Sequence, residues 1–254
     1  MTSNSETPAL SLRGVVKSFG ALPVIQGVTL DVANGHRHAV IGPNGAGKST
    51  LFNLVSGMFP VTEGEIFLNG APITGLAPHR INRAGLSRSF QITNIFHRLS
   101  VFENIRMGVL ARHGRRFDLF SAIARRRAIN DETAEILDTV GLTRRSDHLA
   151  GDLTYSEQRA LEIAMTLSTG AEVILLDEPT AGMSREETAQ AVELIRKVTE
   201  GKTLLMVEHD MSVVFQLCDQ VSVLVYGDIL ATDTPEAISR NAEVQKAYLG
   251  EEAA

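Results

Sequence analysis

Hydrophobic residues in the first third of the chain recur mostly at every second position, which is the spacing of half-buried strands. A turn signal, Asn69-Gly70, follows the last of these segments. The strands predicted from this pattern cover residues 10–16, 25–32, 37–41 and 65–68. The beginning of the chain is therefore expected to be rich in β-structure.

The middle of the chain changes to helical spacing, and the last third alternates helices with short apolar strands. Ser184 and Glu187 form a capping box, which predicts that a helix starts there and ends before Gly201. The other predicted helices cover residues 48–56, 100–110, 121–128, 131–140 and 155–167. The predicted later strands cover residues 173–176, 203–207 and 221–226.

Strands that alternate with helices indicate an α/β fold with a mainly parallel sheet covered on both faces. The helical middle interrupts this alternation without a long linker or an internal repeat. We therefore expect a single domain over residues 1–254, with a core and β-subdomain formed by residues 1–91 and 171–254. Residues 92–170 are expected to form an inserted helical subdomain.

Composition narrows the classes of function. The chain has 254 residues, 44% of them hydrophobic, and a formal net charge of −6. An acidic chain is a poor sequence-independent binder of nucleic acid, because phosphate contacts require a positive face. A single cysteine, Cys218, excludes an intrachain disulfide framework and is typical of a reducing compartment. No segment has the layout of a signal peptide or the length of a membrane span.

A complete phosphate-binding motif, Gly42-x-x-x-x-Gly47-Lys48-Ser49, lies between a predicted strand and a predicted helix. Glycines let successive backbone N–H groups face phosphate oxygens, and the helix N-terminus adds a positive dipole end. Lys48 is expected to contact the β- and γ-phosphates, and the Ser49 hydroxyl to contact Mg²⁺. The predicted nucleotide-binding residues of this loop are Gly42, Pro43, Asn44, Gly45, Ala46, Gly47, Lys48, Ser49 and Thr50.

A second motif is the apolar strand 173–176, which ends in Asp177 and Glu178. Its carboxyl end should lie at the same sheet edge as the phosphate-binding loop. Asp177 is then suited to hold Mg²⁺, and Glu178 to polarise an attacking water. Together the two motifs predict a nucleoside triphosphatase that uses Mg²⁺.

With these motifs the chain resembles the ATP-binding-cassette (ABC) ATPases over nearly its whole length, which implies that the nucleotide is ATP. That resemblance implies a P-loop NTPase cassette with a RecA-like core, an N-terminal antiparallel β-subdomain and an inserted α-helical subdomain. It implies that Phe19 stacks on adenine, that Gln91 acts near Mg²⁺ and in catalysis, and that His209 contacts the γ-phosphate. The signature segment, which in this family acts on the ATP of a second protomer, corresponds to Leu153, Thr154, Tyr155, Ser156 and Glu157.

Several stretches are similar to one branch of the family, the ATPase subunits of branched-chain (hydrophobic) amino-acid importers. They are Arg83 to Gln91, Asn94 to Asn104, Leu161 to Ala164, Glu178 to Met183 and Val244 to Gly250. The resemblance implies a second ABC ATPase subunit in a homo- or heterodimer, two multi-span permease subunits and, indirectly, a periplasmic substrate-binding protein. It also implies a peripheral position on the cytoplasmic face of the inner membrane.

Some positions depart from the family's pattern. Tyr155 and Ser156 stand where the signature has glycines, and Glu157 stands where it has glutamine. Ser184 replaces the aspartate of the loop after the second motif. These changes affect what this chain contributes to the ATP site of a second protomer, and not its own ATP binding. They keep open a low-turnover regulatory ATP-binding subunit, beside a stand-alone ATPase of lipid export or iron–sulfur assembly.

Seven arginines concentrate in the helical middle of the chain. A solvated face, docking onto a membrane partner or the anionic leaflet, and nucleic-acid binding are alternative interpretations of this charge. These residues are Arg106, Arg112, Arg115, Arg116, Arg125, Arg126 and Arg127.

Overall fold

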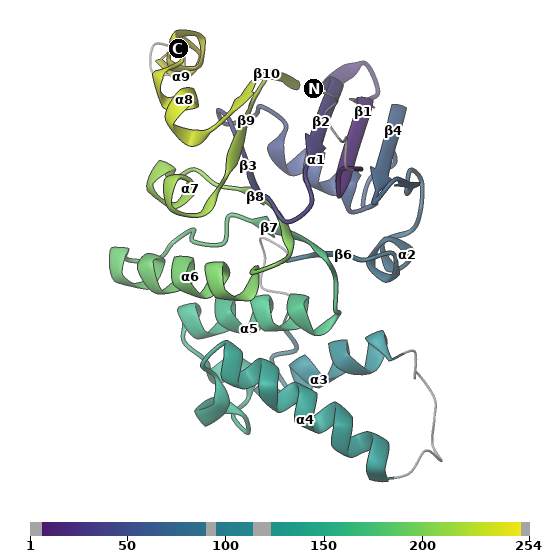
Figure 1. Ribbon diagram of the computed structural model, residues 1–254, viewed down its shortest axis with the longest axis vertical. Coiled ribbons are helices and arrows are strands. Elements are labelled where there is room, and N and C mark those ends of the chain that lie inside the picture. Colours follow the sequence, from purple (N-terminus) through teal and green to yellow (C-terminus); the bar gives the residue numbers. More distant parts are fainter. Residues whose placement is uncertain (1–6, 90–94, 114–122, 250–254) are drawn as a thin grey trace, which may run out of the picture.

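The computed structural model describes residues 7–89, 95–113 and 123–249. Two sheets occupy one half of the elongated molecule, and a group of helices occupies the other (Figure 1). The N-terminal sheet lies beside the first helix, and the helices from the middle of the sequence lie at the far end.

The smaller sheet is formed by the alternating segments of the first third. It is antiparallel, in the order β2-β1-β4-β5. On β1, Leu12 lies opposite Leu30 of β2 and Ile66 of β4, so one face of the sheet is apolar. Its strands are β1 (Leu10–Phe19), β2 (Leu22–Val32), β4 (Glu63–Leu68) and β5 (Ala71–Pro72).

The larger sheet has the order β10-β9-β3-β8-β7-β6, and every pairing is parallel except that of β10 with β9. The predicted mainly parallel sheet is therefore confirmed. Its strands are β3 (Arg37–Ile41), β6 (Leu86–Arg88), β7 (Val173–Asp177), β8 (Thr203–Val207), β9 (Gln220–Val225) and β10 (Asp228–Asp233).

The helices follow the sequence prediction in the long amphipathic segments and add short ones at α2, α7, α8 and α9. The capping box of Ser184 and Glu187 starts α6 as predicted. The helices are α1 (Lys48–Val55), α2 (Pro78–Arg83), α3 (Val101–Arg112), α4 (Ile123–Thr139), α5 (Tyr155–Ser168), α6 (Arg185–Val198), α7 (Met211–Leu217), α8 (Pro235–Arg240) and α9 (Ala242–Leu249).

The prediction of two helices over residues 121–128 and 131–140 is wrong, because α4 runs through both without a break. Ile129 lies at the expected boundary and is buried. The Thr133 hydroxyl donates a hydrogen bond of 2.7 Å to its carbonyl. Since no proline or glycine interrupts the segment, polar residues alone do not end the helix.

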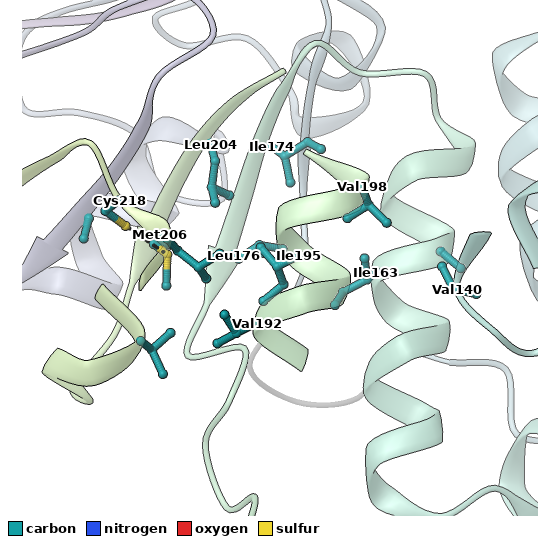
Figure 2. Packing of buried hydrophobic residues seen from close by; sticks show 14 of the residues in the cluster. Val140, Ile163, Ile174, Leu176, Val192, Ile195, Val198, Leu204, Met206 and Cys218 are labelled. Carbon is teal, nitrogen blue, oxygen red and sulfur yellow. Dashed lines mark hydrogen bonds between the residues drawn. The ribbon is translucent and has the colours of Figure 1, made fainter. Parts of the chain in front are cut away.

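The parallel strands are apolar on both faces. Leu204 and Met206 of β8 face the helical layer, whereas Leu205 and Val207 face α1 and the smaller sheet. Figure 2 shows Ile174 and Leu176 of β7 with Leu204 and Met206 beside Val192 and Ile195 of α6. Continuous hydrophobic strands of this kind are expected where helices or a second sheet cover both faces.

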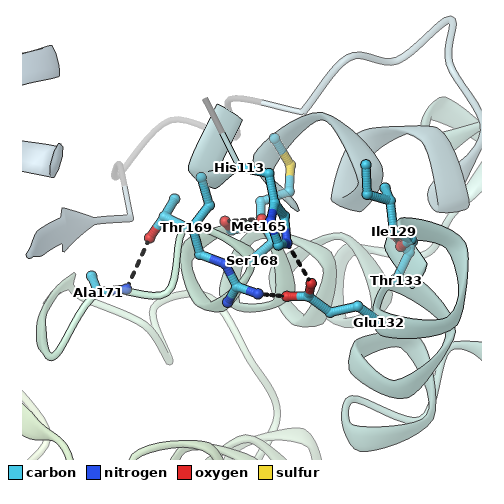
Figure 3. A network of polar contacts seen from close by, with 9 residues as sticks. His113, Ile129, Glu132, Thr133, Met165, Ser168, Thr169 and Ala171 are labelled. Atoms are coloured by element: carbon cyan, nitrogen blue, oxygen red, sulfur yellow. Dashed lines mark hydrogen bonds and ion pairs between the residues drawn. The ribbon is translucent and has the colours of Figure 1, made fainter. Parts of the chain in front are cut away.

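Helices α3, α4 and α5 pack together at the far end of the molecule (Figure 1). Glu132 of α4 accepts a hydrogen bond of 3.0 Å from the ring of His113 and pairs with Arg112, both from the end of α3 (Figure 3). Arg106 pairs with Glu103 on the same helix. These two arginines of the basic group are thus partnered by carboxylates of the same helical group.

The carboxyl ends of β3, β8, β7 and β6 lie at one edge of the larger sheet, since these strands are parallel neighbours. The phosphate-binding loop follows β3, and Asp177 ends β7. His209 follows β8, and Arg88 ends β6. Ligands of open parallel sheets bind at this edge, so the fold brings the predicted motifs together.

Candidate functional site

The phosphate-binding loop leads directly from β3 into α1. Gly47 is the N-cap of α1 with a φ of 106°, a left-handed conformation that glycine adopts without strain. Gly42 lies so close to the Leu224 carbonyl that an added Cβ would clash with it. The two outer glycines of the motif are therefore required by backbone geometry before any nucleotide binds.

Lys48 is buried against its own loop. Its ammonium group donates hydrogen bonds of 2.6 Å and 2.8 Å to the carbonyl oxygens of Gly42 and Pro43. Residues 44–50 line a cavity of about 330 Å³ beside the loop. The N-terminus of α1 opens into this space, and its positive dipole end favours an anionic ligand.

Glu178 and His209 line the same cavity from the ends of β7 and β8. The His209 Nε2 atom lies 2.8 Å from the Glu178 Oε1 atom. The Glu178 side chain is largely buried, and that of His209 is half exposed. A carboxylate and an imidazole thus meet opposite a phosphate-binding loop, which is an arrangement able to orient a water and contact a terminal phosphate.

Asp177 lies deeper and does not line the cavity. Its Oδ2 atom accepts a hydrogen bond of 2.8 Å from Arg88, whose guanidinium also donates to Asn53 and Ser56 at the end of α1. The Oδ1 atom is buried and has no hydrogen-bond partner within the described residues. A buried carboxylate oxygen of this kind is a hard ligand suited to Mg²⁺ or to a water bound to it.

Phe19 is exposed at the end of β1 and does not line the cavity. Its ring makes an edge contact with Phe59 at 5.5 Å between centroids. The Lys17 ammonium lies 4.9 Å from the ring centroid, while also donating to the Pro60 carbonyl. The aromatic predicted to meet adenine is therefore available on the surface.

The signature segment lies at the start of α5. Thr154 is the N-cap, and the Glu157 carboxylate accepts a hydrogen bond of 2.9 Å from the Thr154 N–H, so the two residues form a capping box. The Arg145 Nε atom donates to Glu157 Oε1 at 2.8 Å. Partial burial acts to raise the pKa of Glu157, but the Thr154 N–H and the Arg145 guanidinium outweigh it and lower that pKa. The carboxylate is thus turned toward the cap and an arginine of its own chain.

Tyr155 connects the signature segment to the loop after β7. Its hydroxyl donates a hydrogen bond of 2.9 Å to the Ala181 carbonyl and accepts one of 3.3 Å from Arg159. A glycine at this position could not make either contact. The departure from the family's pattern therefore creates a tether between α5 and the segment that leads to Ser184.

Gln91 lies outside the described residues. The remaining residues predicted for catalysis, Glu178 and His209, are in contact, whereas residues 153–157 are absent from the cavity lining. Sequence reasoning did not single out Arg88 and Arg145, which donate hydrogen bonds to Asp177 and Glu157, or Glu208, which accepts one from the Thr180 hydroxyl. Only the position of Arg88 just before Gln91, and of Glu208 just before His209, could have drawn attention to them.

Two family profiles match the chain. The profile described as ABC transporter matches residues 25–181. A second, described as branched-chain amino acid ATP-binding cassette transporter, matches residues 229–254. Within the described part of the chain, no helix is long and apolar enough to cross a membrane.

Curated relatives match over nearly the whole chain. One is the high-affinity branched-chain amino acid transport ATP-binding protein LivG of Escherichia coli (strain K12), 37% identical over 96% of this chain and 98% of its own length. Another is BraF of Pseudomonas aeruginosa, with the same description and the same coverage, at 39% identity.

Solved structures support the same fold. The ADP conformation of MJ1267, an ATP-binding cassette of an ABC transporter, superposes with a TM-score of 0.84 at 25% identity, over 95% of this chain and 98% of that one. CbiO1 of Clostridium perfringens superposes with a TM-score of 0.81 at 22% identity, over 97% and 100%. The predicted cassette fold is thereby confirmed.

Proposed function

Because the chain belongs to the ABC transporter family of ATP-binding cassettes, we propose that it is the ATP-hydrolysing subunit of a branched-chain amino-acid importer. Proteins of this family bind and hydrolyse ATP and work with membrane permease components. The observation that carries the proposal is the cavity in which the phosphate-binding loop faces the Glu178–His209 pair.

Hydrolysis would proceed by attack of water on the γ-phosphorus of ATP, with cleavage of the bond to the β-phosphate oxygen, to yield ADP and phosphate. Residues 44–50 would hold the phosphates through backbone N–H groups, and Lys48 would exchange its carbonyl partners for phosphate oxygens. Glu178 would orient the water and accept its proton, and His209 would hold Glu178 and contact the γ-phosphate.

Ser49, Asp177 and Gln91 are the residues proposed to hold Mg²⁺. When bound, the ion neutralises charge that develops on the phosphate oxygens. The buried Oδ1 atom of Asp177 fits this role, because Arg88 already holds the other carboxylate oxygen in place. Phe19 is proposed to stack on the adenine ring.

We further propose the assembly that such a subunit requires. A second ATPase subunit, identical or paralogous, would place its own ATP against residues 153–157 of this chain. Two multi-span permease subunits and a periplasmic substrate-binding protein would complete an importer, with this chain on the cytoplasmic face of the inner membrane. Within the chain, residues 92–170 would form the helical subdomain and the remainder the core and β-subdomain.

Lys48→Ala tests the function in the complex purified from membranes through a tag on this chain. We expect ATP hydrolysis to fall by about 100-fold or more, because the transition-state charge loses a fixed cation. ATP-driven uptake of leucine into proteoliposomes should be lost with it.

Lys202→Ala is the matched control. Lys202 precedes β8 at the opposite edge of the sheet and contacts the Ala171 carbonyl, so both rates should stay at the parent value. Co-purification without permease subunits, or uptake of a substrate other than branched-chain amino acids, would contradict the importer assignment.

A further inference from the structure

Glu208 is a buried carboxylate to which neither motif of the site assigns a role. It follows β8 directly, between Val207 and His209, and only 3% of its surface is exposed. It does not line the cavity beside the phosphate-binding loop. Buried carboxylates require partners that compensate for lost hydration, so the contacts of Glu208 indicate what it does.

Within the described residues, the hydrogen bonds of the Glu208 side chain all go to the two loops that carry Glu178 and His209. Its Oε1 atom accepts hydrogen bonds from the Thr180 backbone N–H at 3.1 Å and from the Thr180 hydroxyl at 2.5 Å. Its Oε2 atom accepts a hydrogen bond of 3.0 Å from the His209 backbone N–H. One side chain therefore joins the backbone after β7 to the backbone after β8.

The loop after β7 needs such a restraint. Glu178 has a φ of 47°, a left-handed conformation that is unfavourable for a residue with a side chain. Its N–H donates a hydrogen bond of 3.0 Å to the Val207 carbonyl. The strained residue is thus fixed to the end of β8 on one side by Val207 and on the other, through Thr180, by Glu208.

We propose that Glu208 is a positioning residue for hydrolysis, which sets the relative placement of Glu178 and His209. The carboxylate holds the loop two residues after Glu178 and the backbone of His209 itself, and these two side chains then meet at 2.8 Å. The inference rests on the proposed function, in which Glu178 orients the attacking water.

Glu208→Gln in the full complex tests the inference. An amide of the same size has one acceptor oxygen, so it can accept from Thr180 or from the His209 N–H but not from both. We expect kcat for ATP hydrolysis to fall by about 10- to 100-fold, because small misplacements of catalytic groups slow a reaction by factors of this order. The KM for ATP should stay within about threefold, because the phosphate-binding loop makes no contact with Glu208.

Variants of Thr180 provide a second, independent measurement. Thr180→Val removes only the hydroxyl donor and should lower kcat, whereas Thr180→Ser restores it and should recover most of the rate. Glu208→Gln combined with Thr180→Val should be hardly slower than Glu208→Gln alone, since either change breaks the same link between the loops after β7 and β8. If Glu208→Gln does not fold, the Thr180 pair decides the question.

Glu132→Gln and Thr199→Val are the matched controls. Glu132 pairs with Arg112 and His113 in the helical group, and Thr199 is a buried threonine at the end of α6. Both variants should keep the parent kcat even if their melting temperatures fall.

Glu178→Gln, measured in parallel, separates the two hypotheses. If Glu178→Gln is inactive while Glu208→Gln and Thr180→Val hydrolyse ATP at the parent kcat, the positioning role is overturned and the proposed function stands. A loss of kcat in the two control variants as large as in Glu208→Gln would also overturn it. Parent-rate hydrolysis by Glu178→Gln would overturn both.

Discussion

His38 is an example of how the fold alters a single residue. It lies on β3, is 1% exposed, and its Nε2 atom is 2.8 Å from the Ser222 hydroxyl on β9. Burial, assisted by the charge of His36, lowers the pKa of His38 to about 4. In the folded chain His38 is therefore neutral near pH 6.5, where a free histidine is half protonated.

The low pKa of His38 predicts acid sensitivity. In the unfolded chain His38 binds a proton below pH 6.5, whereas in the folded chain it does so only near pH 4. The contribution of His38 to the free energy of unfolding is therefore fully present above pH 6.5. It declines by about 3 kcal/mol as the pH falls toward 4. Urea unfolding at a series of pH values measures the decline. His38→Gln should show a shallower slope over the same interval, and equal slopes would contradict the assignment.

Cys218 shows a similar effect of burial on a different group. The thiol packs 3.4 Å from the Met206 sulfur, and burial, with the nearby charge of Asp219, raises its pKa to about 12. The side chain behaves as a small apolar group of the core, as Figure 2 shows. Its chemistry plays no part in the site.

At the scale of elements, α5 shows how a helix start can serve two purposes. The Thr154–Glu157 capping box satisfies N–H groups at the start of the helix, and it also sets the orientation of the signature segment. Because Glu157 is used in the cap and paired with Arg145, its charge is offset within the chain. The substitution of glutamate for glutamine is thus accommodated locally.

Thr154→Ala separates the two purposes. We expect the loss of the cap to cost about 1 kcal/mol of unfolding free energy, which lowers the melting temperature by about 2–4 °C. Ser100→Ala removes the corresponding cap of α3 and should cost a similar amount.

ATP hydrolysis by the complex then distinguishes the two helices. Thr154→Ala should reduce it, because this hydroxyl is proposed to face a partner's ATP, and Ser100→Ala should not. Equal hydrolysis in both variants would mean that the Thr154 side chain only caps its helix.

At the scale of the whole molecule, the signature segment at the start of α5 does not line the cavity beside the phosphate-binding loop. Tyr155 connects the signature segment to the loop after β7, which also carries Glu178. A movement of α5 caused by a partner subunit would therefore displace the loop that carries Glu178. In the proposed head-to-tail dimer, this contact would connect the partner's ATP, at the signature segment, with Glu178 of this chain.

Glu178→Gln should trap that dimer. The amide cannot accept a proton from water, while the phosphate-binding loop is intact, so ATP should remain bound. Size-exclusion chromatography with ATP should show a species of twice the 27.5 kDa chain, or a heterodimer once a paralogous ATPase is added. The double variant with Lys48→Ala should stay monomeric. The absence of any ATP-dependent species in both experiments would argue against the dimer.

Much of the site could be predicted from the sequence because it depends on local chemistry. The glycines and Lys48 occupy adjacent positions in one turn, Asp177 and Glu178 end one apolar strand, and Ser184 and Glu187 are three residues apart. Each pattern carries its own physical reason. The parallel sheet also followed, since buried strands alternating with helices have few ways to pack.

Other features were decided only by tertiary structure, because their partners lie far apart in the sequence. Arg88 reaches Asp177 across 89 positions, Thr180 meets Glu208 across 28, and Arg145 meets Glu157 from a preceding turn. No periodicity encodes such pairs. The first two form where parallel strands bring their carboxyl ends to one edge, and the third forms where the turn at residues 143–145 lies against the start of α5. The sequence by itself determined the phosphate-binding motif and the acidic end of one strand, because both are local patterns. The packing of β6, β7 and β8 decided which side chains hold Asp177 and Thr180 in position, because those contacts join distant segments.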